Sequence, residues 1–140
     1  MKTALRLLAM FFLSTVLLSS GCKKSGGGGG GGGGTTEANL AVTTTPANGS
    51  VQPPSLGPFD LSVIITSPMP SGGVKIEVTA KREDNSVQHF SQTINSTSSA
   101  TSNFSITNTP LTAVCVVDIK VTSNSKPTNT WSGSYRYSRK

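Results

Sequence analysis

Short stretches of this chain alternate between apolar and polar residues, and this period of two limits the folds open to it. The alternation is clearest in residues 73–82, where every second side chain is apolar: Val74, Ile76, Val78 and Ala80. Successive side chains of a β-strand point to opposite faces, so such a stretch buries one face and exposes the other. From residue 35 onward, 33 of 106 residues are Ser or Thr and four are Leu. This composition disfavours helices, and with the alternation it predicts an all-β fold.

Seven stretches have the length and pattern of strands, and clusters of Pro, Gly, Asn and Ser separate them. They are residues 40–45, 59–66, 73–82, 87–94, 100–107, 113–123 and 131–138. Seven short strands with a turn signal after each are typical of a β-sandwich, and a small barrel is the alternative.

The number, order and spacing of these strands resemble those of immunoglobulin-like domains, and of fibronectin type III domains in particular. The resemblance implies a seven-stranded sandwich over residues 37–140, in which the third, sixth and seventh strands are neighbours. Their outward charges would then share one solvent face: Lys75, Glu77, Asp118, Lys120 and Arg136. Charges of mixed sign suit an exposed sheet face. The cysteine pair of antibody domains is absent, because Cys115 is the one cysteine of this region.

Residues 1–21 have the features of a secretory signal peptide. Lys2 and Arg6 form a basic start, and residues 7–18 are an apolar run interrupted by Ser14 and Thr15. Small residues follow at positions 19–21. The apolar run is shorter than the roughly 20 residues that span a bilayer, which disfavours the alternative of a retained membrane anchor.

The segment Leu18-Ser19-Ser20-Gly21-Cys22 resembles the lipobox of bacterial lipoproteins, although Ser19 stands where that family usually has Leu. The resemblance implies cleavage before Cys22, a diacylglyceryl group on its sulfur and often a third acyl chain on its amine. Two or more chains give a stable attachment, because each buried CH₂ contributes about 0.8 kcal/mol. The residue after the cysteine, Lys23, fits the lipoproteins that are sent to the outer membrane. A secreted protein with a free cysteine is the alternative.

Residues 26–34 are nine consecutive glycines. A run without side chains has nothing to bury and keeps its backbone freedom, so we expect residues 22–36 to be the lipidated cysteine and a tether. A phosphate-binding loop would need a following Lys-Ser or Lys-Thr, and the chain has Thr35-Thr36-Glu37 instead.

The net charge of +6 does not describe the folded region. Four of the basic residues precede residue 35, and from there on eight basic residues face six acidic ones, a net charge of +2. The sequence has no basic stripe of the kind that binds nucleic acid, so a nucleic-acid partner is not expected.

Trp131, Tyr135 and Tyr137 share one face of the last predicted strand. This face could be a stacking platform for sugar rings, or it could point into the core, since the polar residues of the strand lie on the other face. Met69 lies between two prolines in the loop at 66–73 and is a second candidate contact. It could be an exposed apolar tip for a partner or part of an ordinary strand connection.

No catalytic or metal site is expected from the sequence. Cys115 lies mid-strand among valines, which predicts a buried, unreactive thiol. The single histidine, His89, is expected at the surface, and one histidine builds neither a zinc site nor a catalytic triad with these neighbours. Glu83 and Asp84 are expected at a charged hairpin tip. We therefore expect a protein without enzyme activity or cofactor.

These features predict a lipid-anchored protein of the bacterial envelope, on the outer membrane, whose Ig-like domain is a non-enzymatic interaction or structural module. The expected partners are the lipid bilayer, through acylated Cys22, and a protein. The alternative is a carbohydrate-binding accessory lipoprotein of a glycan-uptake system, with a glycan as partner. Exposed aromatic side chains would favour the glycan, and their burial would favour the protein.

Overall fold

The computed structural model describes residues 36–96 and 98–140, which belong to one compact unit. The features predicted for residues 1–35, including Cys22 and the glycine run, lie outside the described residues. The described residues form seven strands and contain no helix. The strands are β1 (Val42–Thr45), β2 (Phe59–Ile65), β3 (Val74–Arg82), β4 (Gln88–Ser96), β5 (Thr101–Ile106), β6 (Val114–Ser123) and β7 (Thr130–Ser138).

The all-β prediction is confirmed, and each predicted strand is present with its ends shifted by at most two residues. The alternation of buried and exposed positions is the reason, because it is regular in β3, β5 and β6. In these three strands the phase of the apolar residues alone assigns each side chain to a face.

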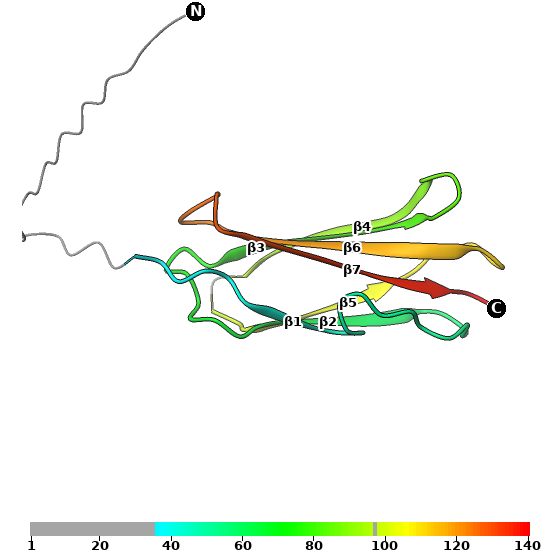
Figure 1. Ribbon diagram of the computed structural model, residues 1–140, viewed down its shortest axis with the longest axis horizontal. Coiled ribbons are helices and arrows are strands. Elements are labelled where there is room, and N and C mark those ends of the chain that lie inside the picture. Colours follow the sequence, from blue (N-terminus) through cyan, green and yellow to red (C-terminus); the bar gives the residue numbers. More distant parts are fainter. Residues whose placement is uncertain (1–35, 97) are drawn as a thin grey trace, which may run out of the picture. The chain divides into compact units, whose positions relative to one another are not determined.

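The strands form two antiparallel sheets, in the orders β1-β2-β5 and β4-β3-β6-β7 (Figure 1). The third, sixth and seventh strands are therefore neighbours, as expected. Figure 1 shows the two sheets as separate layers, which is the arrangement of a β-sandwich and not of a closed barrel.

The core lies between the two layers and is built from the inward faces of both sheets. The first sheet contributes mainly Leu61, Val63, Ile65, Phe104 and Ile106. The second contributes Val74, Ile76, Val78, Ala80, Cys115, Val117, Ile119, Val121, Tyr135 and Tyr137. The inward faces predicted for the third and sixth strands are thus confirmed. Burial of this apolar surface is the main stabilising term of the fold.

The segment that follows β1 crosses to the other sheet and pairs with β7. Its backbone runs parallel to β7, through Gly49 N to Ser134 O at 2.7 Å and Gln52 N to Arg136 O at 2.8 Å. Arg136 N returns a bond to Ser50 O at 2.9 Å. The outer edge of β7 is therefore occupied by the same chain, which satisfies backbone groups that an edge strand would leave open.

Residues 37–40 are fastened to the turn between β6 and β7 by polar side chains. The buried Asn129 accepts a bond from Leu40 N at 3.0 Å, and its amide donates to Glu37 Oε1 at 2.6 Å. The buried Ser123 hydroxyl donates to the other carboxylate oxygen of Glu37 at 3.0 Å. These bonds hold the first described residues against the sandwich, so the folded domain begins before β1.

The outer face of the four-stranded sheet carries the mixed charges predicted for it. Lys81 pairs with Asp118 at 2.7 Å, and Lys75 pairs with Glu77 at 3.1 Å. All four side chains are well exposed, and exposed ion pairs of this kind contribute about 0–1 kcal/mol each. The charges on this face therefore keep the sheet surface soluble and avoid like-charge repulsion between strands, but they add little to stability.

Candidate functional site

Tyr135 and Tyr137 point into the core, where they are 2% and 1% exposed. Their rings lie 6.0 Å apart, and Tyr137 packs edge-on against Phe59 of β2 at 4.5 Å. Of the two interpretations of this strand face, burial excludes a surface platform built from all three aromatic residues. The two tyrosines are instead large core side chains that join the sheets.

The Tyr137 hydroxyl is the centre of a buried polar cluster. It lies 2.9 Å from His89 Nε2 and 3.0 Å from Thr109 Oγ1, so it links β4, β7 and the loop after β5. Burial raises the pKa of Tyr137 to about 12, so the phenol stays protonated under ordinary conditions. Burial also raises the pKa of Tyr135, whose hydroxyl is buried without a hydrogen-bond partner among the described residues.

His89 is not the simple surface residue expected from the sequence. It is half-buried, and it is the extra residue at a β-bulge, since Ala80 pairs with Phe90 and Lys81 pairs with Gln88. The bulge lets the imidazole reach the Tyr137 hydroxyl, while His89 Nδ1 is buried without a partner among the described residues. Burial lowers the pKa of His89, which favours the neutral ring.

Trp131 lies at the start of β7 and is half-buried against the core. Its indole lies over Gly133, where a Cβ on residue 133 would overlap the ring. The same Cβ would lie 2.9 Å from Asn48 Oδ1. Asn48 in turn accepts a bond from Ser134 N at 2.8 Å. Glycine at 133 thus makes a slot for the indole, which closes the edge of the sandwich with part of its surface still open to solvent.

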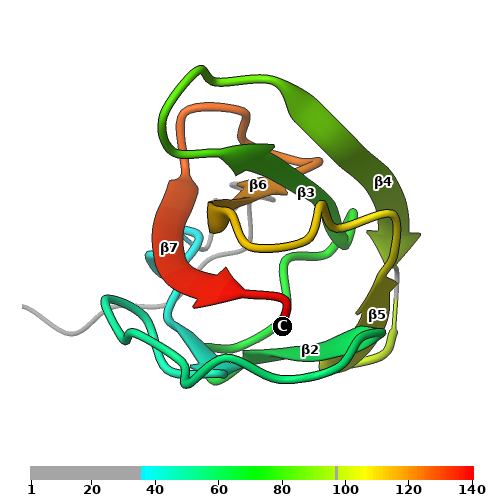
Figure 2. The ribbon, with the colours of Figure 1, turned by 90° about the vertical axis from the view of Figure 1, so that its right-hand side faces the viewer.

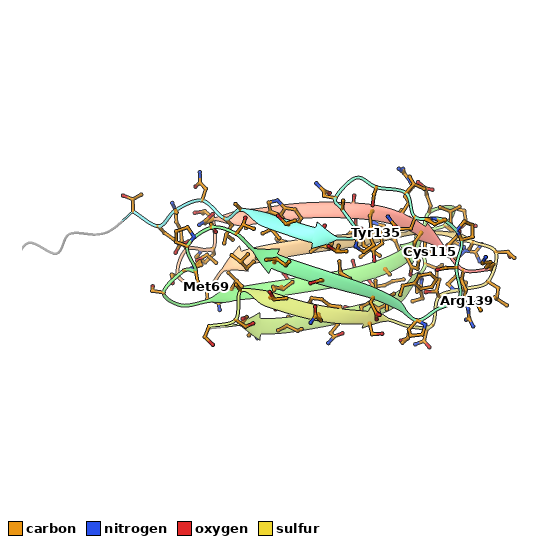
Figure 3. All side chains as sticks on the ribbon, turned by 90° about the horizontal axis from the view of Figure 1, so that it is seen from below. Met69, Cys115, Tyr135 and Arg139 are labelled. Atoms are coloured by element: carbon orange, nitrogen blue, oxygen red, sulfur yellow. The ribbon has the colours of Figure 1, made fainter. Side chains whose placement is uncertain are left out.

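Met69 lies at the end of the sandwich where the described chain begins (Figure 3). It is half-buried, packs against the core and lines a wide groove of about 730 Å³ together with Glu37, Ala38 and Lys126. The side chain is therefore an anchor of the loop between β2 and β3 as much as an exposed tip.

Cys115 is fully buried on β6, and burial raises the pKa of its thiol. Its sulfur donates a long bond to Ala113 O at 3.7 Å. A protonated thiol without solvent access is a poor nucleophile, which agrees with the prediction from the surrounding valines. Glu83 and Asp84 lie in the turn between β3 and β4, where the Arg82 guanidinium donates to Asp84 and lowers the pKa of its carboxyl.

Five large apolar side chains of the described residues are exposed, and all belong to one end of the sandwich. They are Val51, Leu56, Val87, Leu111 and Val114. They lie in the loop before β2, in the turn before β4, in the loop after β5 and at the first position of β6. We call this the far end, because the described chain begins at the opposite end (Figure 1). Single exposed apolar residues are ordinary, whereas a group confined to one end marks a candidate contact surface.

The loops of the far end are held in place by the end of the chain. Ser55 and Leu111 each form a bridge with Arg139, and Thr112 N donates to Arg139 O at 3.0 Å. The neighbouring side chains Leu56 and Leu111 are 74% and 60% exposed, although their backbones are fixed in this way. Figure 2 looks onto this end and shows the C-terminus among the loops. Apolar side chains on a fixed backbone lose little conformational entropy when a partner covers them.

Strained backbone positions also gather at the far end. Three of the described residues other than glycine have positive φ: Ser86 at 59°, Asn108 at 57° and Thr112 at 58°. All three lie in the turns and loops of this end. A β-branched residue such as Thr112 rarely adopts this conformation, and such strain concentrates at functional sites.

A pocket of about 270 Å³ opens at the far end between the loop before β2 and the loop after β5. Its walls include Pro58, Phe59, Ile106 and Arg139. Arg139 Nη1 donates to Thr109 O at 3.2 Å, while its Nε is buried without a partner among the described residues. The volume lies just below the range of about 300–1,000 Å³ of small-molecule sites, so the pocket suits a side chain of a partner better than a separate ligand.

The sequence alone did not single out the far end. Leu56 lies between Ser55 and Gly57 in a loop rich in proline, and Val114 is out of phase with the buried residues of its strand. These two apolar residues without an inward position were the available signal. Their gathering at one end depends on pairing between segments far apart in the sequence, which no local pattern contains.

Comparisons of the chain with protein-family models, with curated proteins and with solved structures gave no match. Within residues 36–96 and 98–140, no group of three or more His, Cys, Asp or Glu side chains is placed to hold a metal ion. The same residues contain no helix of the length and apolar character needed to cross a membrane.

Proposed function

We propose that the protein is a lipid-anchored envelope protein whose residues 37–140 are a fibronectin type III-like, non-enzymatic interaction module. The lipobox-like segment ending at Cys22 supports the anchor, and Lys23 supports the outer membrane as its location. The glycine run at 26–34 would separate the module from the bilayer.

The order of the strands supports the finer assignment of the fold. The fourth strand pairs with β3 and does not join β1, β2 and β5. In immunoglobulin constant domains the fourth strand lies in the same sheet as the first, second and fifth strands, so this sandwich differs from them in the sheet to which its fourth strand belongs. The fibronectin type III-like assignment is compatible with this placement of the fourth strand.

The observation that carries the proposal is the gathering of exposed apolar residues at the far end. Leu111 and Ser55, the neighbour of Leu56, each form a bridge with Arg139, and Phe59 and Arg139 line the pocket beside them. An apolar centre with a few polar groups around it is the usual composition of a protein-binding surface. The anchor would join the opposite end, which leaves the far end free to meet a partner.

Burial of Tyr135 and Tyr137 favours a protein partner over a glycan. A sugar platform needs aromatic faces open to solvent, and of the three predicted residues only Trp131 keeps part of its surface exposed. The carbohydrate-binding alternative therefore has no specific observation in its favour.

The anchor and the side of the membrane are tested by protease shaving of intact cells, with a tag after Lys140 and a Cys22→Ala variant as control. We expect the wild-type chain in the membrane fraction and the variant in the soluble fraction. Equal partition of the two chains would contradict the lipid anchor. Loss of the tag from intact cells would place the module outside, and protection would place it in the periplasm.

The binding surface is tested by site-specific photo-crosslinking in cells. A crosslinking side chain at position 56 or 111 should give a discrete adduct with one envelope protein. The same side chain at Thr128 or Ser98, exposed positions at the opposite end, is the matched control and should give none. Adducts from the control positions alone, or from no position, would contradict an interaction through the far end.

A further inference from the structure

The outer edge of β4 has no hydrogen-bonded strand beside it, although part of β4 lies close to β5 of the other sheet. Among the described residues β4 pairs with β3 alone, and no other backbone hydrogen bond involves residues 88–96. Figure 2 shows β4 at the side of the sandwich, away from β7. A row of unpaired N–H and C=O groups fits one kind of partner, an extended strand about 4.8 Å away.

The other edges are less available. The edge of β7 is hydrogen-bonded to residues 49–55, and β1 is four residues long. β5 is also an edge strand, but its inward side chains Ser102, Phe104 and Ile106 are already buried. A strand added to β5 would therefore cover little further apolar surface.

Apart from the bulge at His89, β4 lacks the features that usually protect an edge strand. Its nine residues, Gln88–Ser96, contain no proline and no lysine, arginine, aspartate or glutamate. On its inward face, Phe90 and Ile94 are half-buried opposite Ala80 and Ile76 on β3, and Gln92 between them is exposed opposite Val78. An added strand would cover the part of the Phe90 and Ile94 side chains that is still exposed.

The sequence of β4 is complementary to itself in one antiparallel register. With Gln92 opposite Gln92 of a second copy, Phe90 lies opposite Ile94, and Ser91 lies opposite Thr93. The first pair is aromatic with β-branched on the inward face, and the second is a hydroxyl pair on the outward face. Both are favourable cross-strand pairs, and the two-fold symmetry repeats each of them.

We propose that two copies of this chain associate through antiparallel pairing of their β4 strands about a two-fold axis at Gln92. The pairing joins the two four-stranded sheets into one continuous sheet. It runs from Phe90 to Ile94 in each copy and ends at the bulge at His89. This interface is separate from the far end and does not rest on the function proposed for it.

The test uses residues 22–140 with Cys22→Ser, which keep the tether but not the lipid, in sedimentation equilibrium over a range of concentrations. Gln92 is exposed, so Gln92→Lys and Gln92→Glu should both fold. Each should weaken dimerisation at least about tenfold, because the register places like charges opposite each other. Asn103→Lys, an exposed position on the edge strand β5, is the matched control and should dimerise like wild type.

An equimolar mixture of the Gln92→Lys and Gln92→Glu chains should recover the dimer, since the register then pairs opposite charges. A monomeric wild-type chain at all concentrations would overturn the proposal. So would a dimer unaffected by charge at position 92, or one equally weakened by Asn103→Lys. A mixture that fails to recover the dimer would overturn the register at Gln92.

Discussion

Tyr135 and Tyr137 lie two residues apart on β7 and are both buried, yet their hydroxyls differ. The Tyr137 hydroxyl bonds with His89 and Thr109, whereas the Tyr135 hydroxyl has no partner among the described residues. We expect Tyr137→Phe to lower the free energy of unfolding by about 1–3 kcal/mol, because it leaves two partners unsatisfied. Tyr135→Phe should be neutral or stabilising, because it removes a buried group that is already unpaired.

Urea unfolding followed by tryptophan fluorescence measures both variants against wild type. The two substitutions remove the same atom from neighbouring buried positions, so each is the control of the other. Equal losses for both would contradict the role assigned to the Tyr137 cluster.

We expect His89 to make the stability of the fold depend on pH. Burial lowers its pKa from the ordinary value of 6.5, so the unfolded chain binds a proton at a higher pH than the folded one. The stability contributed by the neutral ring is therefore present above about pH 6.5 and is lost as the pH falls through the lowered pKa. We expect the free energy of unfolding to fall between about pH 7 and about pH 5.

Unfolding of wild type and His89→Gln over this range checks the assignment. His89 is the single histidine, and histidine is the side chain that ordinarily changes its charge in this range, so the variant should show a flatter profile. An unchanged slope in the variant would contradict a role for this imidazole.

The same residue shows where prediction from sequence stops. The sequence predicted a strand at residues 87–94, and the structure has β4 there, but the sequence could not reveal the bulge at His89, because the bulge depends on the pairing with β3. Without the bulge the imidazole would not reach Tyr137. The aromatic face of β7 was likewise placed correctly on one side of its strand, while its burial depended on how the two sheets pack.

Among the elements, β7 has one face in the core, and residues 49–55 of the same chain cover its outer edge. At Gly133 the absence of a side chain leaves room for both the Trp131 indole and the Asn48 amide. We expect Gly133→Ala to lower the free energy of unfolding by about 1–3 kcal/mol through overpacking. Ser132→Ala, at the neighbouring exposed position, should change it by less than about 0.5 kcal/mol.

Urea unfolding in a Trp131→Leu background distinguishes overlap with the indole from an effect of the substitution on the strand itself. If the loss comes from overlap with the indole, Gly133→Ala should cost clearly less once the ring is replaced by a smaller side chain. An equal cost in both backgrounds would instead indicate an effect on the strand itself.

The strands predicted from the sequence agree with the structure wherever one face of the strand is buried and the other is exposed to solvent. β3 follows the pattern up to Lys81 and β6 through its whole length, which fixes their register as well as their existence. The parallel segment at 49–55 has no such alternation and was expected only as a loop. Its bonds to β7 are backbone bonds, so its side chains did not reveal them.

For the whole molecule, the sequence predicted the number of strands and the inward faces of the third and sixth strands. It did not predict the candidate binding surface, because the far end is formed by loops around residues 56 and 111 that meet beside Arg139. Contacts between distant segments that rest on backbone bonds leave no periodic pattern. The open edge of β4 is similar: its lack of charge is visible in the sequence, but its position at the border of a sheet is not.

The folded molecule includes residues before β1, and truncation tests where it begins. Glu37 and Leu40 are bonded to Asn129, and Leu40 is buried, whereas the glycine run at 26–34 has no side chains to bury. A chain starting at residue 36 should therefore unfold within about 0.5 kcal/mol of residues 22–140 carrying Cys22→Ser. A chain starting at residue 41 should lose about 2–5 kcal/mol, because it gives up a buried leucine and leaves the Asn129 amide and the Ser123 O–H without their partners. Urea unfolding of the three chains measures both steps, and a comparable loss for the two truncations would show that the glycine-rich segment takes part in folding.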